Sequence, residues 1–402
     1  MNVELEAQLA RIKSREPTVR AWVHHDPDRV REEAAIAPHG LLHSFTLGVK
    51  DIFDTADMPT TYGSSIYEGY QPPADAAAVA LARAEGAVLM GKTVTTEMAF
   101  LTPGPTTNPY DPTRTPGGSS SGSAAAVADG MVRVALGTQT AGSVIRPASF
   151  CGVVGFKPSH GLLPISGVHL FAPTLDTVGT FARTVDDVIV LHRALTGRVV
   201  DELNDPPRIG LYESHQWESI GDSARHAVTA AAKRAADCGA TGVGVAPIGH
   251  SHDLDRAQVA IMAYEGARSL SHDRLRNAGR LSPELMAFLR RGTELSADEY
   301  DAALRLTEVG RDQMNRVFET VDVLLTPAAP DEAPLGIDGT GDPRCNRMWT
   351  LLGLPCVTVP GHRGATGLPV GVQVVARRGD DSTALAVARW LSRLLPKPSP
   401  PT

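Results

Sequence analysis

Cysteine is scarce in this 402-residue sequence, and the four that occur form no metal-binding or redox pattern. They lie far apart and make no CxxC pair, the spacing typical of zinc and redox sites. Of the 13 histidines, neither His24-His25 nor His250-Ser251-His252 has the spacing of a helical metal pair. We therefore expect no metal and no cofactor, and we interpret the cysteines as reduced core thiols.

The sequence also lacks a basic surface and a long hydrophobic run. Its 38 basic residues are scattered among 45 acidic ones, which leaves a net charge of -7 and no basic face for a phosphate backbone. No apolar stretch approaches the length of a membrane span, and the first residues predict a charged amphipathic helix rather than a secretion signal. We expect a soluble, cytoplasmic protein that binds neither nucleic acid nor membranes.

No linker divides the sequence. Its content of 42% hydrophobic and 21% charged residues is that of an ordinary globular enzyme. No Pro/Ser/Gly stretch or charge run separates two self-contained patterns, so residues 1–395 are predicted to form a single domain. Residues 396–402 contain four prolines, which do not continue the preceding amphipathic helix, and are predicted to be a disordered tail.

The N-terminal half alternates helix and strand patterns. The Ala-rich segment 76–85 predicts a helix ended by Gly86, and the apolar run 87–90 predicts a strand. The same order recurs where residues 123–129 predict a helix and residues 132–136 a buried strand. This rhythm is typical of an α/β fold with reactive loops beside buried strands.

The second half is predicted to be mainly helical from about residue 184 to residue 318, as a layer that shapes a pocket. Strand patterns return at residues 321–325, 357–359 and 370–375. Residues 382–395 predict a closing amphipathic helix.

Two segments carry residue types that suggest chemistry. In residues 47–51, Lys50 enters an apolar, strand-like run, and burial lowers the pKa of a lysine enough to leave a neutral amine that acts as a base. A surface or salt-bridged lysine is the alternative for this segment by itself. Residues 116–123 combine glycines, which let the backbone approach a ligand, with serines at a helix N-terminus. A flexible loop or an ordinary helix cap fits that segment equally well.

A third segment, residues 137–147, places small residues and hydroxyls directly after a predicted strand. Consecutive backbone N–H groups before Ser143 are placed to form an oxyanion hole, a feature that stabilises the developing negative charge in acyl transfer. The residues that would supply them are Thr140, Ala141 and Gly142. Taken singly, this segment also fits a structural turn.

Together and in this order, the three segments resemble those of the amidase signature enzymes, whose hallmark is a Ser, cis-Ser, Lys triad. The resemblance extends over most of the chain and implies an α/β fold with a large mixed β-sheet core covered by helices on both faces. Its further motifs are residues 48–54, 59–64, 91–93, 108–109, 147–158, 175–179, 353–355 and 367–373.

Position by position, the resemblance makes Ser143 the nucleophile, Ser119 the cis-peptide serine that relays a proton, and Lys50 the base. Neutral Lys50 accepts a proton from Ser119 while Ser119 deprotonates Ser143. Return of the proton expels the amine, and water then hydrolyses the acyl-enzyme. The resemblance thus implies hydrolysis of an amide or amide-like C–N bond of a small molecule, with the acyl group and amine left open. Aliphatic and aryl amides, hydrazides and urea-derived compounds all fit.

The sequence departs from the family pattern at four positions. Gln139 stands where the family usually has Asp, and Ala141 where it has Gly. Arg146 lies three residues after Ser143 rather than two, and Ser121 replaces a glycine. The roles of Gln139 and Arg146 are therefore left open.

Several rival functions fit parts of the sequence. Residues 118–122 match a GxSxG elbow with Ser120 as nucleophile and His362 as a distal base, but the proline-rich segment before them is not a strand. A cysteine nucleophile is a second rival. A third is a silent scaffold or a subunit of a larger complex, like the A subunit of the glutamyl-tRNA amidotransferase. The intact set of Lys50, Ser119 and Ser143 argues against silence but not against a partner, and the resemblance also allows a homodimer.

Overall fold

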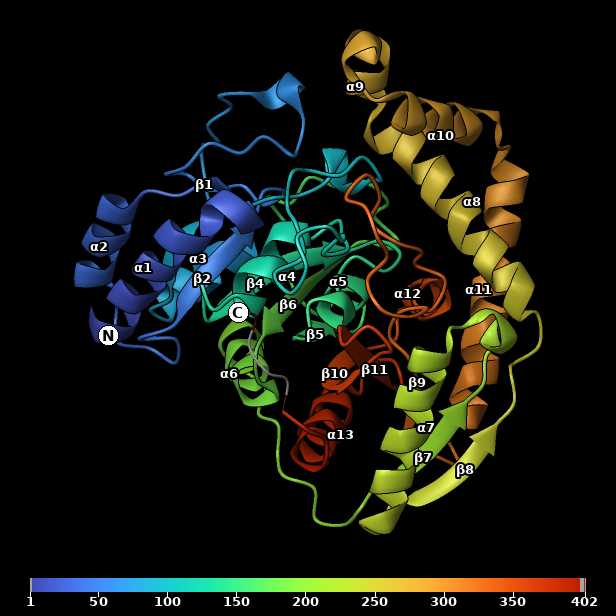
Figure 1. Cartoon of the computed structure of the whole chain (residues 1–402). Coiled ribbons are helices and arrows are strands. Elements are labelled where there is room, and N and C mark those ends of the chain that lie inside the picture. Colours follow the sequence, from blue (N-terminus) through green and yellow to red (C-terminus); the bar gives the residue numbers. More distant parts are fainter. Residues whose placement is uncertain (1, 398–400, 402) are drawn as a thin grey trace.

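The computed structural model describes residues 2–397 and residue 401. Its centre is one mixed β-sheet, in which the eleven strands of the described residues follow the order β1-β3-β2-β4-β6-β5-β10-β11-β9-β7-β8 (Figure 1). The strands are β1 (Trp22–His24), β2 (Thr46–Lys50), β3 (Val88–Thr93), β4 (Val134–Gln139), β5 (Val154–Lys157), β6 (Thr177–Ala182), β7 (Arg208–Tyr212), β8 (Thr241–Val245), β9 (Val323–Pro327), β10 (Cys356–Arg363) and β11 (Pro369–Ala376).

The sheet is parallel near its two ends and antiparallel in the middle. Strand β2 runs parallel to β3 and β4, and β7 runs parallel to β8 and β9. The central strands β4, β6, β5, β10, β11 and β9 pair antiparallel. This mixture confirms the predicted α/β class.

Helices cover both faces of the sheet. They are α1 (Asn2–Val19), α2 (Pro27–Ile36), α3 (Ala77–Ala84), α4 (Ser121–Ala128), α5 (Ile145–Phe150), α6 (Val185–Thr196), α7 (Asp222–Asp237), α8 (Ser251–Ser269), α9 (Ser271–Arg276), α10 (Pro283–Glu294), α11 (Ala297–Val317), α12 (Arg347–Leu352) and α13 (Asp381–Leu394). Helices α4 and α5 touch each other and lie on the central strands, while α6, α13 and α7 follow one another across the sheet (Figure 1).

Local sequence explains the elements that frame the site. Helix α3 is an alanine-rich stretch that ends before Gly86, which has φ +92° and so adopts a backbone conformation that other residues disfavour. Helix α4, which is almost entirely Ser, Gly and Ala, is buried at every position. Its small side chains let the helix approach β2, β3 and β4 closely. This close packing brings the Gly/Ser loop before α4 against the ends of these strands.

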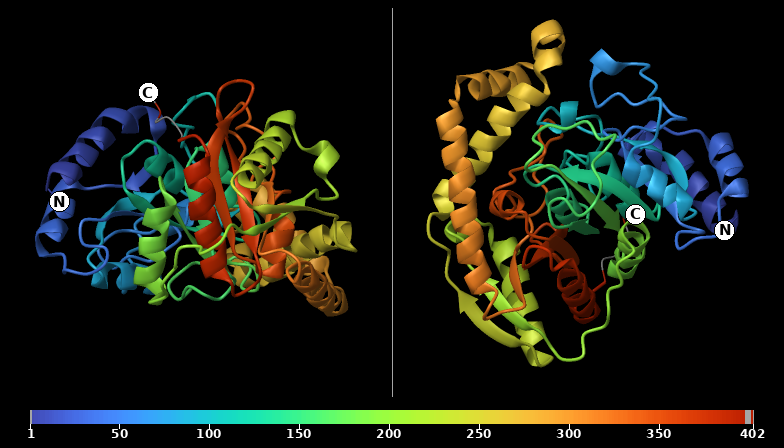
Figure 2. Two further views of the ribbon diagram at one scale, coloured as in Figure 1. Left: turned by 90° about the horizontal axis from the view of Figure 1, so that it is seen from below. Right: turned by 180° about the vertical axis from the view of Figure 1, so that it is seen from behind.

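The range from residue 184 to residue 318 is mainly helical, as the pattern predicts, but it also supplies β7 and β8 at the sheet's edge. Helices α10 and α11 both pack on α8, and the three form an arm at the side of the molecule away from α1 and α2 (Figures 1 and 2). In the predicted tail, residues 398–400 and 402 lie outside the described residues. The carbonyl of Pro401 accepts a hydrogen bond from the Arg11 guanidinium.

Candidate functional site

Lys50 is the last residue of β2, and its side chain is completely buried. Its Nζ donates to the Ser119 Oγ at 2.7 Å and to the Thr138 Oγ1 at 2.8 Å. Burial lowers the pKa of Lys50 to about 7, although the negative charge of Asp176 opposes this fall. Near neutral pH, Lys50 is therefore an uncharged amine in a large fraction of the molecules.

Ser119 follows a cis peptide bond with Gly118, as the family resemblance implies, and lies immediately before α4. The carbonyl group of Gly118 accepts a hydrogen bond of 2.6 Å from the Arg146 guanidinium. The carbonyl group of Ser119 accepts one of 3.3 Å from the N–H of Thr96. Both sides of the cis peptide are thus held by other segments, and the Ser119 hydroxyl faces the amine of Lys50.

The remaining serines of this loop are bonded to the sheet. Ser120 Oγ contacts the backbone of Thr138, donating to its carbonyl at 3.2 Å and accepting from its N–H at 3.3 Å. The Ser121 hydroxyl donates to the Val94 carbonyl, and the Ser123 hydroxyl donates to the Leu136 carbonyl. Because Ser120 is fully buried with its hydroxyl bonded to β4, the geometry argues against the rival assignment of Ser120 as nucleophile.

For three of the four cysteines the role of nucleophile is likewise disfavoured, whereas Cys238 is exposed, so the expectation of a core thiol is wrong for that residue. Cys151, Cys345 and Cys356 have raised pKa values because burial disfavours their thiolates, and the pKa of Cys356 rises to about 12. Thiols in this state are poor nucleophiles at neutral pH.

Ser143 lies half-buried between β4 and α5, in a loop that Gln139 organises. The Gln139 Oε1 accepts hydrogen bonds from the N–H groups of Val144 at 2.9 Å and Ile145 at 3.0 Å. Its Nε2 donates to the Thr350 Oγ1 at 2.8 Å. Gln139, whose role the sequence left open, therefore caps the start of α5 and fixes the path of the chain on both sides of Ser143.

The residues expected to form the oxyanion hole are held by bonds to their carbonyls and side chains. The carbonyl of Thr140 accepts from Gln258 at 3.0 Å, and that of Ala141 accepts from Thr350 at 2.8 Å. The Thr140 hydroxyl donates to Asp176 at 2.5 Å. In the described part of the chain, the N–H groups of Ala141 and Gly142 have no backbone acceptor. The family resemblance assigns both of these N–H groups to an oxyanion hole.

Gly142 is tightly enclosed, which explains why this position has no side chain. A Cβ here would lie 2.5 Å from Asn346 Oδ1, 2.9 Å from Arg146 Nη1 and 3.0 Å from Pro343 Cβ. The segment around residues 340–346 therefore packs directly against the residue before Ser143.

Arg146 links three segments around Ser143 and Ser119. It lies in the first turn of α5, is buried, and donates through Nε to the Thr340 carbonyl at 2.8 Å as well as to Gly118. One guanidinium thus joins the helix after Ser143 to the cis peptide of Ser119 and to the segment that encloses Gly142. This contact gives the displaced arginine a definite structural role.

The structure brings Lys50 and Ser119 into contact, and Arg146 joins the loop of Ser119 to the helix that follows Ser143. Residues that the sequence reasoning missed are Thr138, Asp176, Gln258 and Thr350. Thr138 and Asp176 lie within motifs already noticed, so a signal was present. Gln258 and Thr350 come from distant helices, and no local pattern marks them.

Comparison with known proteins identifies the family. A family model described as Amidase matches residues 4–385. The A subunit of glutamyl-tRNA(Gln) amidotransferase from Anaeromyxobacter dehalogenans (strain 2CP-C) is 36% identical over 470 aligned residues, covering 99% of this chain and 94% of that protein. The chain therefore belongs to the amidase family, and it is a hydrolase of amide C–N bonds.

Solved structures agree with this assignment. A crystal structure of an amidase superposes with a TM-score of 0.89 at 31% identity, covering 98% of this chain and 95% of that chain. A chain from a vestigial protein complex, described as revealing the evolutionary origins of an s-triazine catabolic enzyme, superposes with a TM-score of 0.90 at 27% identity, with coverages of 98% and 96%.

No helix among residues 2–397 is both long enough and apolar enough to cross a membrane.

Proposed function

We propose that this chain hydrolyses an amide or amide-like C–N bond of a small molecule through an acyl-enzyme on Ser143, with Ser119 as proton relay and Lys50 as base. The observation that supports this most strongly is the hydrogen bond of 2.7 Å between the Lys50 amine and the Ser119 hydroxyl, both of which belong to buried residues. A buried lysine of lowered pKa is a suitable base, because its neutral form is populated at neutral pH.

We propose the following sequence of proton transfers, which starts from the contact between Lys50 and Ser119. Lys50 takes the Ser119 proton as Ser119 takes that of Ser143, and the Ser143 Oγ forms a bond to the substrate carbonyl carbon. The carbonyl oxygen becomes an oxyanion facing the N–H groups of residues 140–142. The proton then returns from Lys50 through Ser119 to the leaving nitrogen, and the C–N bond breaks. Water repeats the transfers on the acyl-enzyme and releases the acid.

A second candidate function is that of an A-type subunit in an amidotransferase. It is favoured by the 36% identity to such a subunit over almost the whole chain. In that case Ser143 would release ammonia from an amide donor for use by a partner. The two functions share the same acyl-enzyme chemistry and differ in whether a partner protein is required.

The working location and assembly are also part of the proposal. We place the enzyme in the cytoplasm, acting on a small-molecule amide and forming either a monomer or a homodimer. The four free cysteines support a reducing compartment, since disulfides are rare there. Light scattering of the purified chain measures its oligomeric state directly.

The experiment that tests the function measures ammonia or amine release from a panel of amides, hydrazides and ureido acids. Wild type is compared with Ser143→Ala, Ser119→Ala and Lys50→Ala, and Ser120→Ala serves as the matched control from the same loop. We expect the first three variants to lose activity while folded and the control to retain it. An active Ser143→Ala enzyme would show that the nucleophile is another residue.

Labelling of the protein by a sulfonyl fluoride separates the two candidate functions. The Ser143 Oγ forms a bond to sulfur as the S–F bond breaks, fluoride leaves, and the serine proton passes through Ser119 to Lys50. Mass spectrometry of the labelled peptide then locates the nucleophile without a known substrate. A Ser143 adduct together with no turnover of any amide favours the subunit that needs a partner.

A further inference from the structure

Asp176 is a buried carboxylate that the proposed proton relay does not use. It lies directly before β6, in the Leu175-to-Gly179 motif noticed in the sequence. Its Oδ1 accepts the Thr140 hydroxyl at 2.5 Å, and its Oδ2 accepts the N–H groups of Phe171 at 2.7 Å and Ala172 at 2.9 Å. One carboxylate therefore joins the start of the oxyanion-hole loop to the loop that precedes β6.

No basic side chain of the described residues forms an ion pair with Asp176, although burying a carboxylate without a cation is costly. Three hydrogen bonds offset part of this cost, and the pKa of Asp176 nevertheless rises to about 6 because of burial. At neutral pH the group still carries its charge. Because burying this charge is unfavourable, its presence points to a function for the Asp176 carboxylate.

Two charged groups interact electrostatically with Asp176. The first is Lys50 at the end of β2, whose pKa the negative charge of Asp176 raises against the stronger effect of burial. The second is Glu265 of α8, whose charge raises the pKa of Asp176. Glu265 is itself fixed by the hydroxyl groups of Thr174 and Tyr300, at 2.6 Å and 2.7 Å. Lys50 is therefore the cation on which Asp176 acts.

We propose that Asp176 is a positioning residue of the Ser143 site, which fixes Thr140 at the start of the oxyanion-hole loop and stabilises the ammonium that Lys50 becomes during attack. This inference rests on the proposed function. A carboxylate near Lys50 but not bonded to it favours the protonated form without trapping it, because the amine keeps its bonds to two hydroxyl groups. The Thr140 contact couples this charge to the backbone that faces the substrate oxygen.

The decisive variant is Asp176→Asn, which keeps the shape of the side chain and removes its charge. Only six lysines occur in the sequence, so protein labelled with carbon-13 at lysine Cε gives few signals, and the Lys50 signal is assigned with Lys50→Met. We expect Lys50 in Asp176→Asn to titrate at lower pH than in wild type, since the charge that raises the pKa of Lys50 is gone. We also expect kcat to fall by about tenfold or more, because the oxyanion donors are misplaced.

Asp381→Asn is the matched control, because Asp381 is also buried and accepts a backbone N–H, from Ser159 at 2.7 Å. It is expected to leave the Lys50 titration unchanged. If Asp176→Asn also leaves that titration and kcat unchanged and lowers only the melting temperature, Asp176 is merely structural and the inference is wrong.

A second pair of variants tests the positioning role without altering the charge of Asp176 directly. Thr140→Val removes the hydroxyl that Asp176 holds, and Thr140→Ser retains it. We expect Thr140→Val to lower kcat with little change in KM and Thr140→Ser to remain near wild type. Equal activity of the two variants would contradict the positioning role. The lysine titration needs no turnover, so an active Ser143→Ala enzyme would refute the proposed nucleophile while leaving the link between Asp176 and Lys50 standing.

Discussion

Lys50 and Lys92 lie on the neighbouring strands β2 and β3, one position out of register, and both are fully buried. Their partners differ. Lys50 touches the hydroxyl groups of Ser119 and Thr138. Lys92 touches the Asp51 carboxylate at 3.1 Å, the Phe53 carbonyl at 2.7 Å and the Thr60 hydroxyl at 2.5 Å.

This difference separates the proposed base, Lys50, from a structural cation, Lys92. Carboxylate and carbonyl oxygens only accept hydrogen bonds, so they favour the ammonium form of Lys92, whereas a hydroxyl also donates and is able to pass a proton to a neutral amine. Burial lowers the pKa of both lysines, but at Lys92 the paired Asp51 opposes it, while no carboxylate is bonded to Lys50. Lys157, the third buried lysine, resembles Lys92, since it donates to two carbonyls.

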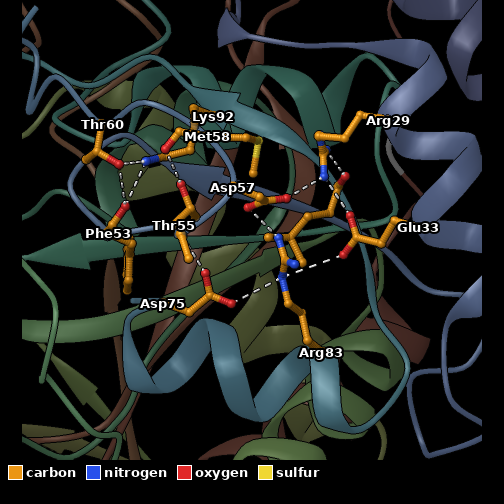
Figure 3. Close-up of polar contacts among 12 residues, drawn as sticks. Arg29, Glu33, Phe53, Thr55, Asp57, Met58, Thr60, Asp75, Arg83 and Lys92 are labelled. Atoms are coloured by element: carbon orange, nitrogen blue, oxygen red, sulfur yellow. Dashed lines mark hydrogen bonds and ion pairs between the residues drawn. The ribbon is translucent and has the colours of Figure 1, made fainter. Parts of the chain in front are cut away.

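The surroundings of Lys92 are also the more heavily charged. Figure 3 shows Lys92 with Phe53 and Thr60 and, beside them, a network in which two arginines bridge three carboxylates. Its members are Arg29, Glu33, Asp57, Asp75 and Arg83. The network ties α2 and α3 to the loop that follows Lys50, and so it supports the end of β2.

The largest expected effect comes from Lys50→Met, which removes the proposed base. We expect kcat to fall by about 10²- to 10⁴-fold, the usual contribution of a general base. The matched variant Lys92→Met should affect kcat far less in the protein that remains folded. Steady-state rates of both variants on the best substrate of the panel measure this difference, and equal losses of activity would erase the distinction.

For the free energy of unfolding, the expected order of the two variants is reversed. Lys92→Met leaves the Asp51 carboxylate buried without its cation, which is expected to destabilise the fold by about 3–5 kcal/mol. Lys50→Met leaves only two hydroxyl groups without a partner and removes a buried amine, so its destabilisation should be smaller. Urea unfolding of the two variants at pH 7 tests this order. A Lys50→Met protein that is the less stable of the two would contradict it.

The pH dependence of the wild type sharpens the comparison further. Burial lowers the pKa of Lys50 to about 7, and the base acts only when it is unprotonated. We therefore expect kcat/KM to rise about tenfold per pH unit below pH 7 and to level off above it. Measuring kcat/KM from pH 5 to pH 9 tests for this rise. A profile that stays flat through pH 7 would mean that Lys50 is not the titrating base.

The smallest expected effect concerns single hydroxyl groups. Thr138→Val removes one of the two partners of Lys50 and is expected to lower kcat by about two- to tenfold, the value of one hydrogen bond. Thr60→Val removes a partner of Lys92 and is expected to leave kcat unchanged. Parallel assays of the two valine variants complete the series; a larger loss of rate in Thr60→Val would place Lys92 in the reaction.

Much of the fold was predictable because its signals are local. The predicted helix 76–85 corresponds to α3 (Ala77–Ala84), whose alanines and following glycine are sufficient signals. Strands β7 and β8 were missed for the opposite reason. Strand β8 has the sequence TGVGV and is largely exposed, and its two glycines, which are disfavoured in strands, weaken the strand signal. It forms because β7 offers it a parallel partner.

The residues of the site divide in the same way, into those that local motifs mark and those that they do not. Family motifs give Lys50, Ser119 and Ser143 by position, and the contact between the first two agrees with that assignment. The side chains that bond to the residues of the site lie far away in the sequence. Thr138 is 88 positions from Lys50, and Thr350 is 211 positions from Gln139. Such contacts depend on strand register and helix packing, which a single sequence does not reveal.

The most direct test of the account is the titration of Lys50 itself. In protein labelled with carbon-13 at lysine Cε, the signals of Lys50 and Lys92 are assigned with their methionine variants and followed from pH 5 to pH 10. We expect Lys50 to lose its proton near pH 7, because burial lowers its pKa to about 7. A Lys50 signal that stays protonated through pH 9 would contradict the claim that this lysine is the base.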